Sequence, residues 1–197
     1  MLIRAATDDD WAQIWPFYRA IAEAGETYAI DPAITSEQAR REWMQTPPGC
    51  TFVAVAEHGS VIGSACCYPN RPANGSHIAS ASFMVDPAAG GQGAGRKLGE
   101  CVIAWARDQG FRAMQFNAVV ATNERAVELW RSLGFDVLAT VPEAFRHPRD
   151  EICHSTIYKR RHRNDVKHKL ANAGETGWGF PGGDLDQAVG VKGTDSV

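Results

Sequence analysis

The sequence predicts one α/β (α+β) domain, because apolar segments with strand or helix periodicity alternate along its first 159 residues. At 197 residues, the chain has the length of one domain with some residues left over, given roughly 150 residues per domain. The expected order is strand, two helices, three strands, helix, strand, helix and two strands. That order excludes a helical bundle and a β-sandwich.

The N-terminal part is expected to form a short strand at 3–5 and then two helices. Three aspartates at 8–10 stand where the dipole of a starting helix favours acids. Apolar residues then recur at helical spacing over 11–22, and Pro16 is expected to kink or restart this helix. A second, short helix is expected over 36–43.

The middle of the chain is expected to form three strands. Strands at 51–57 and 61–68 are separated by His58-Gly59, which is typical of a hairpin turn. A loop of Pro, Gly and Asn over 69–76 then leads to a strand at 78–85.

The last part of the predicted domain holds two helices and three strands. Apolar spacing from Leu98 onward predicts a helix that ends at Gly110. Asn123 is a suitable cap for the second helix, and Gly134 supplies its C-terminal stop. The strands are expected at 114–120, 135–141 and 152–158.

Charge and hydrophobicity exclude several classes of protein. Lys and Arg total 20 against 23 Asp and Glu, so the net charge is −3, without the cationic excess of a nucleic-acid binder. No apolar run approaches the roughly 18 residues of a membrane span. The start of the chain turns acidic without a signal-peptide core. We therefore expect a cytoplasmic protein with no membrane partner.

The cysteine pattern predicts neither a disulfide framework nor a metal site. The five cysteines stand at positions 50, 66, 67, 101 and 153. Their number is odd and no C-x-x-C is present. This pattern favours a reducing compartment.

The composition changes near residue 160. A basic run over 159–169 is followed by seven glycines between 174 and 193, with no strand or helix periodicity. We expect a domain at 1–159 and, at 160–197, a basic and then glycine-rich tail that is disordered. Binding of RNA through 159–169 is an alternative role, although nucleic acid is not the expected partner.

The segment 85–98 carries the clearest functional signal. It joins a strand to a helix and holds four glycines between 90 and 95, which let backbone amides converge. With the positive end of the helix, such amides bind phosphate or pyrophosphate. Cations at 96–97 stand where a merely structural helix start prefers acids.

Two common nucleotide patterns do not fit this loop. A P-loop ends in G-K-[ST], whereas Gly95 is followed by Arg96-Lys97-Leu98. The dinucleotide pattern G-x-G-x-x-G needs a glycine at position 96 or 98. ATP and NAD are therefore disfavoured as ligands.

Two segments resemble motifs of the GNAT superfamily of acyl-CoA-dependent N-acetyltransferases. Residues 90–95 resemble motif A, [Q/R]-x-x-G-x-[G/A], and 123–135 resemble motif B, N-x-x-A-x-x-[LF]-Y-x-x-x-G-F. The order of elements is similar along 2–158. Residues 25–28 with the later Trp43 are most similar to the phosphinothricin-acetyltransferase-like branch.

The resemblance implies a fold, an activity and a co-substrate. The fold is a single domain with a central, mixed, mostly antiparallel sheet of six to seven strands flanked by about four helices. The activity is transfer of an acetyl group from acetyl-CoA, by direct attack, to a primary amine of a small molecule or peptide, with no metal. A homodimer is left open. The alternative is a catalytically silent acyl-CoA sensor.

The resemblance also implies residue roles. Met84 and Val85 would offer backbone groups to the pantetheine arm, and the amides of 91–95 would hold the pyrophosphate with Arg96 nearby. Asn123 would bond the pantetheine arm, unless it only caps its helix. The full set of implied cofactor-binding residues is Phe83, Met84, Val85, Gly90, Gly91, Gln92, Gly93, Ala94, Gly95, Arg96, Asn123 and Trp130.

Two positions depart from the family pattern. Gly90 replaces a Gln or Arg, which removes a side-chain contact but leaves the backbone cradle. Trp130 replaces a tyrosine that often protonates the leaving thiolate, and an indole N–H cannot serve as an acid. A thiol of pKa about 8.5 leaves readily without such help. Simple packing is the alternative role of Trp130.

No carboxylate lies in the strand at 78–85, so a base that accepts the amine proton is not evident there. Glu26, His77 and His147 are the candidates, and a water molecule is the alternative. No His-Asp spacing supports a cysteine acyl-enzyme.

Overall fold

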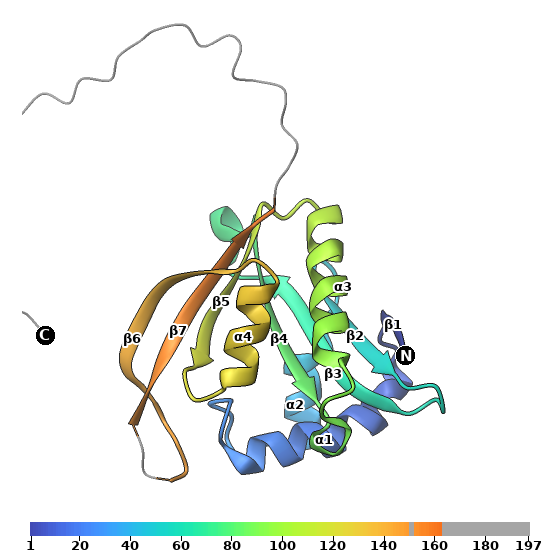
Figure 1. Cartoon of the computed structure of the whole chain (residues 1–197). Helices are drawn as coiled ribbons and strands as arrows, with labels where there is room; N and C mark the ends of the chain where they lie inside the picture. The colour runs from blue at the N-terminus through green and yellow to red at the C-terminus, as the bar shows by residue number, and fades with distance from the viewer. Residues whose placement is uncertain (150–151, 163–197) are drawn as a thin grey trace, which may run out of the picture. The chain divides into compact units, whose positions relative to one another are not determined.

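A seven-stranded sheet in the order β1-β2-β3-β4-β5-β7-β6 organises the chain (Figure 1). The structure is a computed structural model that describes residues 1–149 and 152–162. The strands are β1 Leu2–Ala5, β2 Cys50–Val55, β3 Val61–Pro69, β4 Ile78–Val85, β5 Ala113–Val120, β6 Asp136–Arg146 and β7 Ile152–Arg161. Neighbouring strands are antiparallel except for β4 and β5. The predicted mixed, mostly antiparallel sheet is confirmed.

Helices cover the sheet and build two apolar clusters. In the described part of the chain they are α1 Trp11–Ala24, α2 Ser36–Trp43, α3 Ala94–Asp108 and α4 Glu124–Ser132. One cluster joins strand residues to Leu98 and Val102 of α3 and Trp130 of α4. The other joins Ile14 of α1 and Trp43 of α2 to strand residues. Apolar residues at helical spacing thus bury one face of each helix.

Helix α1 runs through Pro16 without a break, so the restart predicted at Pro16 is wrong. A proline removes one helical hydrogen bond and crowds the preceding turn. Ile14, Phe17 and Tyr18 on either side of it are almost fully buried. Their packing outweighs the lost bond, and the helix continues to Gly25, which ends it in the left-handed conformation (φ 61°).

The C-terminal strands are longer than predicted, and their order in the sheet reverses their order in the chain. β6 continues five residues beyond 141, and β7 pairs with both β5 and β6. β7 continues to Arg161, past the predicted boundary at 159, and the N–H of His162 donates to the Arg112 carbonyl (3.1 Å). The rest of the predicted tail, 163–197, lies outside the described residues.

The parallel strands β4 and β5 pair only at their first residues. Ile78 lies opposite Ala113 and Ala79 opposite Met114, and no residue of β4 after Ala79 pairs with β5. The stretch from Ala79 to Val85 spans about 20 Å of strand. One edge of β4 therefore has no strand partner along most of its length, up to the glycine loop.

An ion pair between the half-exposed Arg4 and the buried Asp10 ties β1 to the start of α1. Arg4 donates to both carboxylate oxygens of Asp10 at 2.7 Å, and the Thr7 N–H donates to Asp10 Oδ2 at 2.7 Å. The Asp10 side chain is only 5 % exposed. The hydrogen bonds from Arg4 lower the pKa of Asp10 to about 2.

Asp10→Asn should destabilise the fold in a pH-dependent way. Because the folded pKa lies below the unfolded value of 3.8, the carboxylate contributes about 2 kcal/mol of unfolding free energy at neutral pH. That contribution is lost as the pH falls from about 4 to about 2. Urea unfolding at pH 7 and pH 3 should show the difference between wild type and variant shrinking by about half. A difference that does not depend on pH would contradict this account of the pair.

Candidate functional site

The loop between β4 and α3 is an open backbone cradle. After a short 3-10 turn over Pro87–Ala89, Gly91 and Gly93 adopt left-handed φ angles of 80° and 79°. A Cβ atom built on either glycine would meet nothing within 4 Å. The chain therefore needs glycine here for its backbone conformation, and the space above both residues is free for a ligand.

Helix α3 presents an uncapped N-terminus to this cradle. Its N-cap residue is Gly93, which has no side chain, and the helix has no capping hydrogen bond from a side chain and no acid in its first turn. The first helical hydrogen bond runs from the Lys97 N–H to the Gly93 carbonyl. The N–H groups of Ala94, Gly95 and Arg96 precede it and are the donors that a phosphate at a helix N-terminus uses.

The open edge of β4 presents the backbone of Phe83 and Val85. The Asp86 N–H donates to the Ile62 carbonyl of β3 (2.9 Å), so alternate residues, including Met84, direct their backbone groups toward β3. Phe83 and Val85 direct theirs away from β3. The predicted backbone contact with an extended ligand thus suits Val85 and Phe83, but not Met84.

The hydroxyl of Tyr28 contacts both backbone polar groups of Phe83. It donates to the Phe83 carbonyl (2.7 Å) and accepts from the Phe83 N–H (2.9 Å). Burial raises the pKa of the Tyr28 phenol above its ordinary value, so the phenol is protonated at neutral pH.

Trp130 packs in a cluster of aromatic rings at the separation of β4 and β5. Its ring centroid lies 4.7 Å from Phe83 of β4 and 4.6 Å from Phe116 of β5. Phe135 stacks on Phe116 at 4.4 Å. Trp130 is only 5 % exposed. The packing role considered for Trp130 is therefore observed, and its contact with a cofactor stays a prediction.

Arg96 and Asn123 both have structural partners. Arg96 of α3 donates to Ser132 Oγ of α4 (2.8 Å), and with Arg125 and Leu129 it lines a cavity of about 420 Å³ beside the loop. The Asn123 side chain accepts from the Ala126 N–H at the start of α4 (3.2 Å). Asn123 therefore caps its helix as expected, and its bond to a pantetheine arm stays a prediction.

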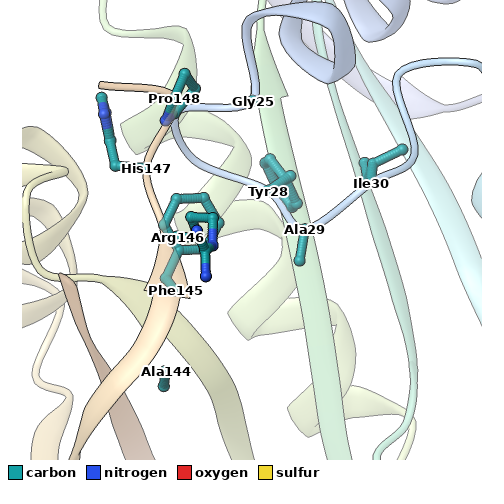
Figure 2. Close-up of a pocket in the computed structure, with 9 residues that line it drawn as sticks. All are labelled: Gly25, Tyr28, Ala29, Ile30, Ala144, Phe145, Arg146, His147 and Pro148. Atoms are coloured by element: carbon teal, nitrogen blue, oxygen red, sulfur yellow. The ribbon is translucent and has the colours of Figure 1, made fainter. Parts of the chain in front are cut away.

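A second cavity, of about 380 Å³, lies between the segment after α1 and the end of β6 (Figure 2). Tyr28, Ala29 and Ile30 line one side of it. The facing residues are Ala144, Phe145, Arg146, His147 and Pro148. Because Tyr28 also touches Phe83, this cavity adjoins the open edge of β4.

The three base candidates lie in different places. His147 is buried and lines the cavity of Figure 2, and its Nδ1 accepts weakly from the Arg149 N–H (3.4 Å). Glu26 is exposed and does not line that cavity. His77 is exposed and precedes β4, at the end opposite Val85. Of the three candidates only His147 lines the cavity, and Figure 2 shows its ring on the side of the chain turned away from Tyr28.

The cysteines near the site are poor nucleophiles. Burial raises the pKa of Cys66 and of Cys67, both in β3, to about 12. The thiolate is the nucleophilic form and is scarce at neutral pH for such thiols. The expectation that no cysteine acyl-enzyme forms is consistent with this environment.

Two cavity residues, Arg146 and Tyr28, are not among the candidates that the sequence indicates. Arg146 ends β6, and no ion pair holds it within residues 1–149 and 152–162. Tyr28 meets Phe83 across 55 positions of sequence. No local pattern signals such a contact, because a loop tyrosine and a strand edge carry no shared periodicity.

Neither a membrane-spanning helix nor a metal cluster is present among residues 1–149 and 152–162. None of the helices in this part of the chain combines the length and the apolar character needed to cross a membrane. In the same described ranges, no three His, Cys, Asp or Glu side chains gather in a way that could hold a metal ion.

Sequence comparison identifies relatives of known type. A sequence model of the "Acetyltransferase (GNAT) family" matches residues 11–135. The N-acetyltransferase aca1 of Schizosaccharomyces pombe is 29 % identical over 141 residues. That match covers 63 % of this chain and 66 % of the yeast protein.

Solved structures share the fold over most of this chain. A GCN5-related N-acetyltransferase from Kribbella flavida is 55 % identical, with a TM-score of 0.80 over 82 % of this chain and 97 % of that one. The Salmonella typhimurium protein yncA, solved with its cofactor acetyl-CoA, is 26 % identical. Its TM-score is 0.75 over 86 % of this chain and 98 % of that one.

Proposed function

The chain belongs to the acetyltransferase (GNAT) family, and we propose that it moves an acetyl group from acetyl-CoA to the nitrogen of a primary amine. The observation that carries the proposal is the early end of β4–β5 pairing, which leaves the edge of β4 open beside the glycine cradle. The Salmonella relative has acetyl-CoA as its cofactor. The yeast relative is named an N-acetyltransferase.

The cradle would hold the pyrophosphate of acetyl-CoA. Backbone N–H groups from Gly91 to Arg96 supply donors, and the α3 N-terminus adds the positive end of a 15-residue helix. Side chains at Gly91 and Gly93 would occupy the same space, which explains why glycine suits both positions. The guanidinium of Arg96 is held toward α4 by its hydrogen bond to Ser132 Oγ.

The open edge of β4 would align the pantetheine arm and the thioester. Val85 offers an N–H and a carbonyl to the amides of the arm, as a neighbouring strand would. A backbone N–H of Phe83 or Val85 would then reach the thioester carbonyl. Hydrogen bonds to the oxygen that gains charge commonly stabilise the transition state of acyl transfer more than any other interaction.

The acceptor attacks as a neutral amine, so its nitrogen loses one proton in the reaction while one bond of the thioester breaks. As the amine nitrogen bonds to the carbonyl carbon, the carbon–sulfur bond breaks and the ammonium proton must leave. In the cavity, His147 is the candidate acceptor for this proton. Because its Nδ1 accepts from Arg149, a neutral ring carries its proton on Nε2, and His147 acts as base only after leaving that bond. Transfer through water avoids this change.

The leaving thiolate would depart without a protein acid from α4. Trp130, at the position of the family tyrosine, is packed among Phe83, Phe116 and Phe135 and cannot give up its indole proton. A thiol of pKa about 8.5 is a good leaving group as its anion. Loss of the tyrosine is therefore compatible with turnover.

The acceptor amine would enter through the cavity of Figure 2. About 380 Å³ suits a small molecule or the end of a peptide, since ligand pockets commonly measure about 300–1,000 Å³. Phe145 and Ile30 supply apolar walls, and Arg146 supplies a cation.

A catalytically silent acyl-CoA sensor is the second candidate function. Two observations favour it. Trp130 replaces a family acid, and β4 carries no carboxylate. A sensor would use the same cradle and strand edge, so binding alone does not separate the two functions, but turnover does.

Acetyl-CoA should stabilise the wild-type protein strongly. At 100 times its dissociation constant, a ligand adds about 2.7 kcal/mol, which raises the Tm of a chain of this size by about 5–10 °C. NAD and ATP should raise it less, because the loop lacks their patterns. The Tm measured with each nucleotide checks this expectation. Equal shifts with all three would contradict a site built for CoA.

A further inference from the structure

The contact between Tyr28 and Phe83 lies at the edge of β4 that has no strand partner. Tyr28 lies on the segment between α1 and α2, and Figure 2 shows it on the wall of the cavity that faces Arg146. Its hydroxyl donates to the Phe83 carbonyl and accepts from the Phe83 N–H, so it provides a partner for both backbone groups of that residue.

This contact replaces a missing strand. Phe83 directs its backbone groups away from β3, and β5 no longer pairs with β4 beyond Ala79. Without a partner, the half-buried N–H and carbonyl of Phe83 would both lack a protein hydrogen bond, which is costly where water has little access. The phenol of Tyr28 supplies the partner, and its oxygen stands where the next polar atom along the edge would stand.

The same position is where the proposed function needs the acyl oxygen. A thioester carbonyl that accepts from the Phe83 N–H competes with the Tyr28 oxygen for that donor. The hydroxyl then loses its acceptor role but keeps its proton. The Tyr28 oxygen lies 2.9 Å from the Phe83 nitrogen, so it must shift aside to admit the acyl oxygen. Its O–H, which now donates to the Phe83 carbonyl, can then turn to that acyl oxygen. Two donors would then converge on one acceptor.

We propose that Tyr28 is a catalytic residue of this transferase, whose hydroxyl joins the Phe83 N–H as the second hydrogen-bond donor to the acyl oxygen. The proposal rests on the proposed function. As the carbon–nitrogen bond forms, the oxygen gains negative charge, and both donors hold it. As the carbon–sulfur bond breaks, the electron pair returns to the carbonyl and CoA leaves as its thiolate. The amine proton goes to His147 or water.

Tyr28 keeps its proton throughout the reaction. A phenol ordinarily has a pKa near 10. Burial raises the pKa of the Tyr28 phenol above that value. Proton transfer from Tyr28 to the thiolate would be uphill, so the hydroxyl acts as a hydrogen-bond donor and not as the acid that Trp130 lacks.

Tyr28→Phe in the 197-residue chain tests the proposal, because it removes the hydroxyl and keeps the ring. With the best acceptor found in an amine panel, kcat should fall about 10²-fold. The dissociation constant of CoA, which has no acyl oxygen, should stay close to the wild-type value. Affinity for the ketone analogue of acetyl-CoA in which a CH2 group replaces the sulfur, so that the carbonyl keeps its place, should fall about fivefold relative to CoA. Tyr18→Phe, which removes a buried hydroxyl from α1, is the matched control and should keep the wild-type kcat and ligand affinities.

The outcomes separate this proposal from a purely structural contact. If Tyr28 only closes the strand edge, Tyr28→Phe lowers the Tm and weakens binding of CoA and of the ketone analogue equally, with kcat close to wild type. That result would overturn the proposal and leave the proposed function intact. The ratio of the two affinities decides the matter even for a protein without turnover. A wild-type protein that binds no CoA compound would overturn the proposed function, and the role of Tyr28 with it.

Discussion

Gly93→Val is expected to abolish binding of CoA and acetyl-CoA while the protein stays folded. Gly93 has φ 79° and is the N-cap of α3. A Cβ there meets no protein atom within 4 Å, so the branched side chain would extend into the space that the pyrophosphate needs. We expect the dissociation constant measured by calorimetry to rise more than about 100-fold, since several charge-assisted bonds at the cradle are lost together.

A matched control separates blocked binding from backbone strain. Gly110 has φ 86°, and its Cβ would also meet nothing within 4 Å, but it lies beyond the opposite end of α3. Valine at either position costs about 1–2 kcal/mol for the left-handed conformation. Gly110→Val should therefore show the same loss of stability as Gly93→Val and keep normal CoA affinity. Equal loss of affinity in both variants would contradict the cradle.

Trp130→Ala is expected to cause the largest loss of stability. The indole is 5 % exposed and lies between Phe83 of β4 and Phe116 of β5. Removing a buried tryptophan typically costs about 3–5 kcal/mol of unfolding free energy, because the cavity left behind closes only in part. Urea unfolding followed by circular dichroism measures the loss. A change below about 1 kcal/mol would show that this cluster does not hold the two strands.

Trp130→Phe separates packing from chemistry at the same position. Phenylalanine keeps an aromatic surface against Phe116 and removes the indole N–H, so kcat should stay near the wild-type value. Trp130→Tyr should be tolerated as well. If Trp130→Phe abolished turnover while CoA affinity and Tm stayed unchanged, the N–H would be essential, and unassisted departure of the thiolate would be wrong.

Local chemistry makes much of the fold predictable. The hairpin turn at His58-Gly59, the cap at Asn123 and the glycine stop at Gly134 each act within a few residues, and the structure has elements that begin or end there. Pro16 is misleading because the burial that keeps α1 continuous comes from residues far away in sequence. The place of β7 between β5 and β6 is likewise a matter of long-range pairing.

The candidate site is predictable only where backbone conformation dominates. The cradle at Gly91 and Gly93 follows from glycine spacing after a strand, and its left-handed φ angles agree with that pattern. Tyr28 and Arg146 reach the site from segments that are distant in sequence, and no residue spacing predicts that they line one cavity. His77 shows the converse, since it is near β4 in sequence but lies at the wrong end of the strand.

Transfer of a labelled acetyl group tests the central claim most directly. Wild-type protein would be incubated with acetyl-CoA carrying a labelled acetyl group and a panel of primary amines, with mass spectrometry of both products. The account predicts labelled N-acetyl amine and free CoA in equal amounts, neither of which forms with Gly93→Val. Tight acetyl-CoA binding with no labelled amide from any amine would contradict the transferase and favour the acyl-CoA sensor.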